Sequence, residues 1–105
     1  MNWIALIVAG VFEIGWPLGL KMAQQPDSNR ISWILIAVVS MTISGMLLFI
    51  AQKTIPIGTA YAIWTGLGAV GTLTVGILFF NDSANILRLL SVGLIVAGIV
   101  GLKLF

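Results

Sequence analysis

The sequence predicts an all-α membrane protein with four transmembrane helices in each subunit. The prediction rests on composition: 60% of the 105 residues are hydrophobic, only 8% are charged, and the mean hydropathy is +1.17. A soluble domain of this length needs far more polar surface. Because about 20 residues cross the hydrocarbon core of a bilayer, four spans use nearly the whole chain and leave no room for a separate soluble domain.

Four apolar runs separated by short polar breaks give the helices in order. In hydrocarbon each run must satisfy its own backbone hydrogen bonds, and runs of this length do so as helices. We predict helices at about 3–21, 31–51, 57–80 and 85–103 of one transmembrane domain that covers 1–105. The breaks hold the turn-forming and charged residues, and Trp3 and Trp33 lie near run ends, where interfacial aromatics are expected.

Composition also excludes several classes of function. The sequence contains neither Cys nor His, which removes disulfides, thiolate chemistry and the commonest metal ligand. We therefore predict no cofactor and no metal site. The net charge of +2 is small and scattered, so nucleic-acid binding has no support. A single acid in the membrane runs, without a nucleophile–base pair, provides too little chemistry for an enzyme.

Glu13 is the only charged residue in the central part of any apolar run. An ionisable group at mid-bilayer depth costs roughly 2.5–3.5 kcal/mol on insertion scales. Folding does not require this expense, so we predict that the carboxylate is kept to bind a cation or a proton.

Gly10, Trp16 and Pro17 share the helical face of Glu13. Gly10 either leaves open space beside the carboxylate or makes a tight helix contact. Trp16 supplies an indole plane, which attracts cations or serves only as packing. Pro17 has no N–H to offer the Glu13 carbonyl, so a kink is expected; it either leaves a spare acceptor for a ligand or has a packing role alone.

The next two runs contribute Ser44, Tyr61 and Trp64. With a rise of about 1.5 Å per residue, Tyr61 lies roughly 6 Å from the surface that carries the N-terminus. Ser44 and Trp64 lie roughly 9–10 Å deep and Glu13 roughly 15 Å. These groups are predicted to line one polar cavity from that surface to mid-membrane. Aromatic stripes are more often packing than binding, so the cavity depends on the acid.

Clustered glycines in the third run, Gly66-Leu67-Gly68-Ala69-Val70-Gly71, match the dinucleotide fingerprint GxGxxG by letters alone. That fingerprint needs a preceding strand, and this stretch lies within an apolar helix. We interpret the glycines as permitting close helix approach and bending.

The fourth run carries small residues at helical spacing and no polar group suited to a substrate. Such faces let helix backbones approach closely, so we predict dimerisation through this helix, with packing inside one subunit as the alternative. The residues are Ser91, Gly93, Ala97, Gly98 and Gly101.

Loop charges give almost no preference for one orientation in the membrane. Lys53 and Lys103 belong to one side, and Lys21, Arg30 and Arg88 belong to the other. Since a Lys/Arg bias normally fixes orientation, a chain without one can insert both ways, and opposed copies can then pair as in inverted-repeat transporters. The alternative is that the bias of one charge orients every copy alike.

These stretches together resemble the small multidrug resistance family over the whole chain, and specifically its guanidinium-exporter branch. The resemblance is carried by 3–21, by the run Lys53-Thr-Ile-Pro-Ile-Gly-Thr-Ala-Tyr-Ala-Ile-Trp-Thr-Gly-Leu-Gly-Ala-Val-Gly71, and by the ending Gly101-Leu-Lys103. Two departures are Pro17, where the family usually has a small non-proline residue, and Ser91, where the drug-exporting branch has glycine.

The resemblance implies an antiparallel, dual-topology homodimer in the bacterial cytoplasmic (inner) membrane that exchanges protons for small cations. It places the essential glutamate at Glu13, its supporting tryptophan at Trp16, the substrate-site serine at Ser44 and the paired aromatics at Tyr61 and Trp64. The expected substrates are guanidinium and small substituted guanidinium cations. The alternatives are an exporter of a broader range of quaternary ammonium and other drug cations, and an accessory subunit that works with a paralogous partner.

Overall fold

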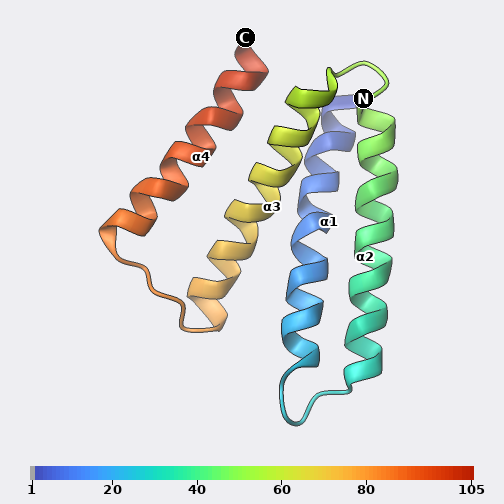
Figure 1. Cartoon of the computed structure of the whole chain (residues 1–105), viewed down its shortest axis with the longest axis vertical. Coiled ribbons are helices and arrows are strands. Elements are labelled where there is room, and N and C mark those ends of the chain that lie inside the picture. Colours follow the sequence, from blue (N-terminus) through green and yellow to red (C-terminus); the bar gives the residue numbers. More distant parts are fainter. Residues whose placement is uncertain (1) are drawn as a thin grey trace.

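The computed structural model describes residues 2–105, which form four helices (Figure 1). They are α1 (Asn2–Ala23), α2 (Arg30–Ala51), α3 (Ile57–Phe79) and α4 (Ile86–Leu104). All are long and apolar enough to cross a membrane, which confirms the all-α prediction with four spans. The ends lie within about two residues of the predicted ones, a normal spread for helix boundaries.

The helices lie side by side in the order α4, α3, α1, α2, and neighbours along the chain run in opposite directions (Figure 1). The molecule measures 46 × 34 × 17 Å, and its short dimension is less than two helix diameters of about 10–12 Å. α1 and α3 are therefore the two inner helices, and α1 packs against α2 on one side and α3 on the other. Among the described helices α4 lies close to the backbone of α3 alone, and it reaches α1 through the Lys103 ammonium, which lies 5.2 Å from the ring centroid of Trp3.

Asparagine side chains define two of the helix starts. Asn29 accepts a hydrogen bond from the backbone N–H of Ser32 at the start of α2, and Asn85 accepts one from Arg88 at the start of α4. Each bond satisfies one of the free N–H groups at a helix N-terminus. α3 ends where Asn81 adopts φ 59°, which turns the chain so that the N–H of Asp82 bonds the Gly76 carbonyl.

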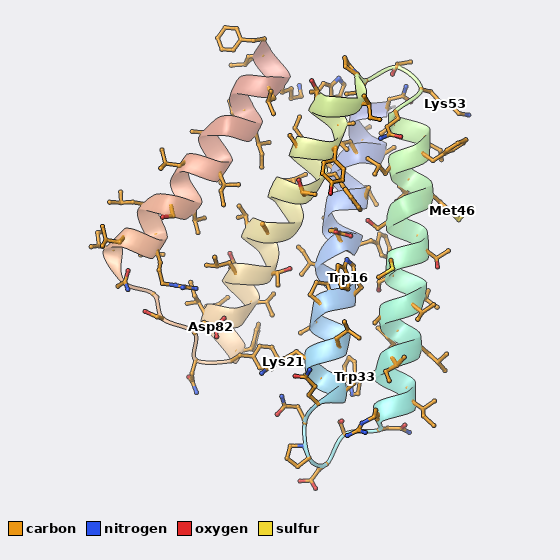
Figure 2. All side chains as sticks on the ribbon, viewed as in Figure 1. Trp16, Lys21, Trp33, Met46, Lys53 and Asp82 are labelled. Atoms are coloured by element: carbon orange, nitrogen blue, oxygen red, sulfur yellow. The ribbon has the colours of Figure 1, made fainter. Side chains whose placement is uncertain are left out.

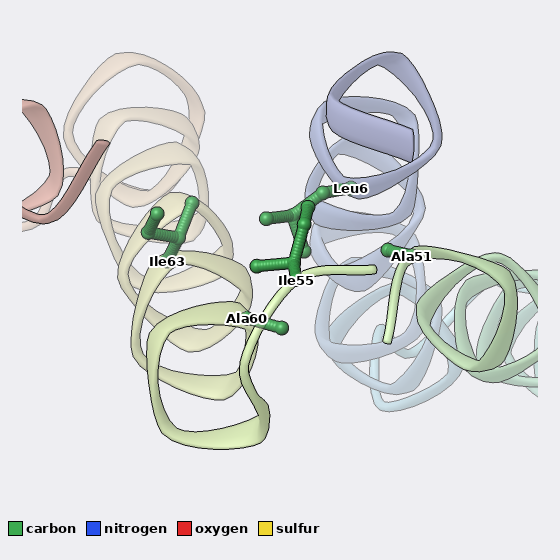
Figure 3. Close-up of a cluster of buried hydrophobic side chains, with 5 residues drawn as sticks. All are labelled: Leu6, Ala51, Ile55, Ala60 and Ile63. Carbon is green, nitrogen blue, oxygen red and sulfur yellow. The ribbon is translucent and has the colours of Figure 1, made fainter. Parts of the chain in front are cut away.

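Buried apolar side chains gather at the end of the molecule that holds the α2–α3 loop (Figure 3). The cluster consists of Leu6, Ala51, Ile55, Ala60 and Ile63, which come from α1, α2, α3 and the connecting loop. Most other large apolar side chains are exposed, as a helical layer surrounded by lipid requires. This cluster fixes the α1–α3 spacing two turns away from Glu13.

Candidate functional site

The Glu13 carboxylate is held by its own helix. Nε1 of Trp16 donates a hydrogen bond to Oε1 of Glu13 at 2.8 Å, and both groups are partly buried. Trp16 lies midway along α1 (Figure 2). The indole thus engages the carboxylate through its N–H, a contact that the three-residue spacing on a helix permits.

Gly68 on α3 makes room for the Glu13 side chain. A Cβ atom at position 68 would lie 2.5 Å from Cγ of Glu13, so only glycine allows α3 to pass this close. Beside this contact is a hollow of about 260 Å³ lined by Glu13, Pro17, Thr65, Gly68, Ala69 and Thr72, which we call the inner hollow. The acid therefore borders open space between α1 and α3.

Ser44 joins three helices one turn away from Glu13. Its Oγ donates to the backbone carbonyl of Ala9 on α1 at 2.7 Å and accepts from Nε1 of Trp64 on α3 at 2.8 Å. The Ser44 side chain is 0% exposed. A buried hydroxyl with both a donor and an acceptor partner fixes the relative height of the helices that it links. Ser44 and Trp64 are thus brought together, but neither of them lines the inner hollow beside Glu13, and Tyr61 does not line it either.

Tyr61 lies at the margin of this group. Its ring centroid is 5.5 Å from that of Trp64, with an interplanar angle of 54°, a normal geometry for paired aromatics. More than half of the residue is exposed (55%), and it lies one turn nearer than Trp64 to the start of α3.

Of the two alternatives at Gly10, the structure excludes open space beside the carboxylate. Gly10 is buried, and a Cβ atom there would lie 2.7 Å from Cβ of Leu67 on α3. The residue therefore makes a tight helix contact, the alternative left open by the sequence. Leu67 occupies this position because α3 is drawn against α1 by the neighbouring glycine, Gly68.

The prediction of close helix approach at the clustered glycines is confirmed. Gly68 faces Glu13, Gly71 is in contact with the side chain of Ile14, and Gly66 faces Ile99 of α4. α3 therefore uses different glycines for its two neighbours.

The small residues of α4 have no such partners within residues 2–105. A Cβ atom at Gly93, Gly98 or Gly101 would meet no atom within 4 Å, and Ser91 and Ala97 are exposed. Packing inside the described part of the chain thus does not account for the three glycines.

Four residues that line the inner hollow were not predicted as site residues: Thr65, Gly68, Ala69 and Thr72. A signal was available: Thr65, Gly68 and Thr72 recur at helical spacing and therefore share one face of α3. The sequence alone does not say which helix lies against Glu13, so it could not show that this face of α3, rather than a face of α2, borders the carboxylate.

A thin layer of membrane-length helices with one carboxylate beside a hollow defines a small multi-pass membrane protein. The family model described as Small Multidrug Resistance protein matches residues 1–95, and the chain belongs to this family.

Relatives of similar length carry a more specific name. A guanidinium exporter of Salmonella typhimurium is 53% identical over 99% of this chain and 97% of its own length. A guanidinium exporter of Yersinia pseudotuberculosis is 49% identical over 99% of this chain and 98% of its own. One from Citrobacter freundii is also 49% identical, over 99% and 97%.

Proposed function

We propose that this protein exports guanidinium in exchange for protons, with both cations competing for the Glu13 carboxylate. The observation that carries the proposal is the placement of Glu13, the one acid within the membrane-spanning helices, at the edge of the inner hollow. The relatives named guanidinium exporters support the choice of substrate.

Guanidinium suits this carboxylate chemically. It is planar and presents several N–H donors, which match the two oxygens of a carboxylate in a bidentate pair. Trp16 occupies Oε1 from one side and presents its ring beside the acid, where it can also contact a bound cation. Ser44 and Trp64 hold α2 and α3 in place around the site, and Tyr61 stands at its outer margin.

Competition alone couples the two fluxes. A protonated Glu13 cannot pair with guanidinium, and a carboxylate paired with guanidinium cannot take a proton. Each turnover therefore exchanges one kind of cation for the other. The apparent affinity for guanidinium accordingly falls as the pH is lowered.

The working unit in this proposal is an antiparallel homodimer. Near-equal loop charges allow both orientations in the bacterial inner membrane, and the open small-residue face of α4 offers the pairing surface. Two copies bring two Glu13 carboxylates to one cavity, where cations and protons compete for both. Rocking of the subunits then exposes the cavity to each side in turn.

The test is guanidinium uptake by proteoliposomes containing Glu13→Gln. The amide keeps the size of the side chain and an oxygen that accepts from Trp16, but it removes the charge. We expect at least about a hundredfold lower exchange, because the charge-assisted pair with the cation is lost. The matched control is Asp27→Asn in the exposed α1–α2 loop, which makes the same charge change away from the hollow. Uptake by the Glu13 variant at the wild-type rate rules out the mechanism.

A broader cation range is a second candidate, favoured by Pro17. This residue lines the inner hollow and withholds an N–H from the Glu13 carbonyl, which leaves an extra acceptor near the carboxylate. Substituted guanidinium and quaternary ammonium ions should then compete with guanidinium uptake. If quaternary ammonium ions compete as strongly as unlabelled guanidinium does, the broader range is favoured. If they do not compete, the site accepts only planar cations with N–H donors.

A further inference from the structure

Thr72 on α3 carries a buried hydroxyl that has no hydrogen-bond partner within residues 2–105. Other threonines on the same helix behave differently. The hydroxyls of Thr65 and Thr74 donate to the carbonyls four residues earlier, at 2.7 and 2.8 Å. Since buried polar groups in proteins nearly always have a partner, the Thr72 hydroxyl is expected to bind water or a ligand.

Thr72 stands where two hollows meet. A second hollow, also of about 260 Å³ and here called the outer hollow, lies between α1 and α3 on the side of the α3–α4 loop. Pro17 and Thr72 line both the inner and the outer hollow. Because one liquid water molecule takes about 30 Å³, each hollow has room for several waters or for a small planar cation.

From Glu13 to the end of α1, residues of α1 and α3 face each other once per helical turn. Glu13 faces Gly68, Pro17 and Thr72 border both hollows one turn further, and Lys21 lines the outer hollow with Gly76 after another turn. At about 1.5 Å per residue, Lys21 lies roughly 12 Å along the helix axis from Glu13. The route therefore extends from mid-helix to the end of α1.

Opposite charges mark the outer end of this route. Lys21 and Asp82 are both exposed and line the outer hollow, and they lie at the same end of the molecule (Figure 2). The Asp82 side chain packs directly on Gly76, which holds the carboxylate at this opening. The Asp82 carboxylate offers a cation a charge partner at this opening, while the Lys21 ammonium on the same hollow opposes its approach, so the attraction comes from direct contact with Asp82 and not from the net charge of the opening.

From these placements we propose that Thr72 is a further binding station for the transported cation. It lies on a passage between α1 and α3 that leads from the Lys21–Asp82 opening to Glu13. The proposal rests on the proposed function for the identity of the cation. The hydroxyl oxygen accepts an N–H of the cation, or a water that hydrates it, after the cation leaves Asp82 and before it reaches Glu13.

Cysteine labelling tests the passage without relying on transport. The sequence has no cysteine, so Thr72→Cys introduces the only thiol. The probe is a membrane-impermeant cationic methanethiosulfonate applied to protein in liposomes, and Thr74→Cys is the control on another face of α3. Because such reagents attack thiolates, which form only where water reaches, we expect Thr72→Cys to react at least about tenfold faster. Equal labelling rates at positions 72 and 74 would contradict a water-filled passage at Thr72.

Guanidinium protection and hydroxyl replacement test the station. Guanidinium should slow the labelling of Thr72→Cys; fast labelling that guanidinium leaves unchanged would overturn the station. In uptake assays, Thr72→Val should lower the rate about fivefold through loss of one hydrogen bond, with equilibrium guanidinium binding little changed. Thr72→Ser, which keeps the hydroxyl, and Thr74→Val should remain near the wild-type rate. A Thr72→Ser variant as slow as Thr72→Val would count against the hydroxyl.

The two proposals fail in different ways. Wild-type protein that does not exchange guanidinium contradicts the proposed function, whereas the labelling contrast between positions 72 and 74 still decides whether the passage exists. Normal wild-type exchange with a Thr72→Val variant of unchanged rate removes Thr72 as a station and leaves the role of Glu13 intact.

Discussion

α1 and α4 have similar composition but opposite surroundings. α1 lies between two helices, and its glycines are in close contact with them: Gly10 meets Leu67, Gly15 meets Ser40 and Gly19 meets the backbone of α2 near Ala37. The backbone of α4 lies close to one helix only, α3, and α4 has no buried residue and leaves its glycines open. Leu94, in the middle of α4, is 75% exposed.

The comparison separates two uses of small residues in a membrane helix. Around α1 they bring helices of one subunit together and create the site beside Glu13. On α4 the same residue types find nothing to pack against within the described chain. Since small-residue faces are favourable where another backbone approaches, our proposal pairs α4 with a second copy of the chain.

The largest effect should follow from a side chain added at Gly19. A Cβ atom there would lie 3.0 Å from the Trp33 carbonyl oxygen, a backbone atom that cannot turn aside. We expect Gly19→Val to lower the free energy of unfolding by about 1–3 kcal/mol, as overpacking of a helix contact does. Denaturant unfolding in detergent, followed by circular dichroism under conditions that separate the subunits, measures this.

The matched variant for that experiment is Gly93→Val on α4. No atom lies within 4 Å of the added Cβ, so the subunit should keep its wild-type stability. If both variants lose the same stability, the contrast between α1 and α4 is wrong.

A smaller effect should follow from closing the open face of α4. We expect Gly98→Val to leave the subunit folded and to weaken dimerisation about tenfold, because the added side chain prevents close approach of a partner backbone. Energy transfer between labelled subunits in liposomes gives the dimer affinity. Gly58→Val is the control, since Gly58 is equally open and lies in the first turn of α3. If the Gly98 variant dimerises as strongly as the wild type, the dimer interface does not include this part of α4.

Much of this architecture could be predicted from composition and spacing. Hydropathy located the helices because lipid permits few other structures for runs of this length. The single acid identified Glu13, and one-turn spacing correctly placed Trp16 beside it. These are local properties, and local properties can be read from a sequence.

Relations between helices were harder to predict. The spacing of Gly10 and Glu13 on one face is real, but only the position of Leu67 on α3 decides whether that face is open. Thr72 was missed for the same reason: its neighbours along the chain are apolar, and its relation to Pro17 exists only because α1 and α3 lie in contact. The pairing of subunits remains a prediction, because it depends on a second chain.

The smallest expected difference is between Trp64 and Tyr61, whose rings pack together but which differ in burial and in hydrogen bonding. Nε1 of Trp64 bonds the buried Ser44, whereas Tyr61 is mostly exposed. Trp64→Phe keeps an aromatic ring and removes the N–H, which leaves Ser44 with only its bond to the Ala9 carbonyl.

We expect Trp64→Phe to weaken guanidinium binding about fivefold, since one hydrogen bond between α2 and α3 is lost and the packing of these helices near Glu13 becomes less fixed. Tyr61→Phe removes a hydroxyl from an exposed margin and should change the affinity by less than about twofold. Equilibrium binding of guanidinium to both purified variants measures the difference. A larger loss in Tyr61→Phe would mean that the tyrosine hydroxyl itself contacts the cation, and the site would then extend from Glu13 toward the start of α3 rather than toward Thr72.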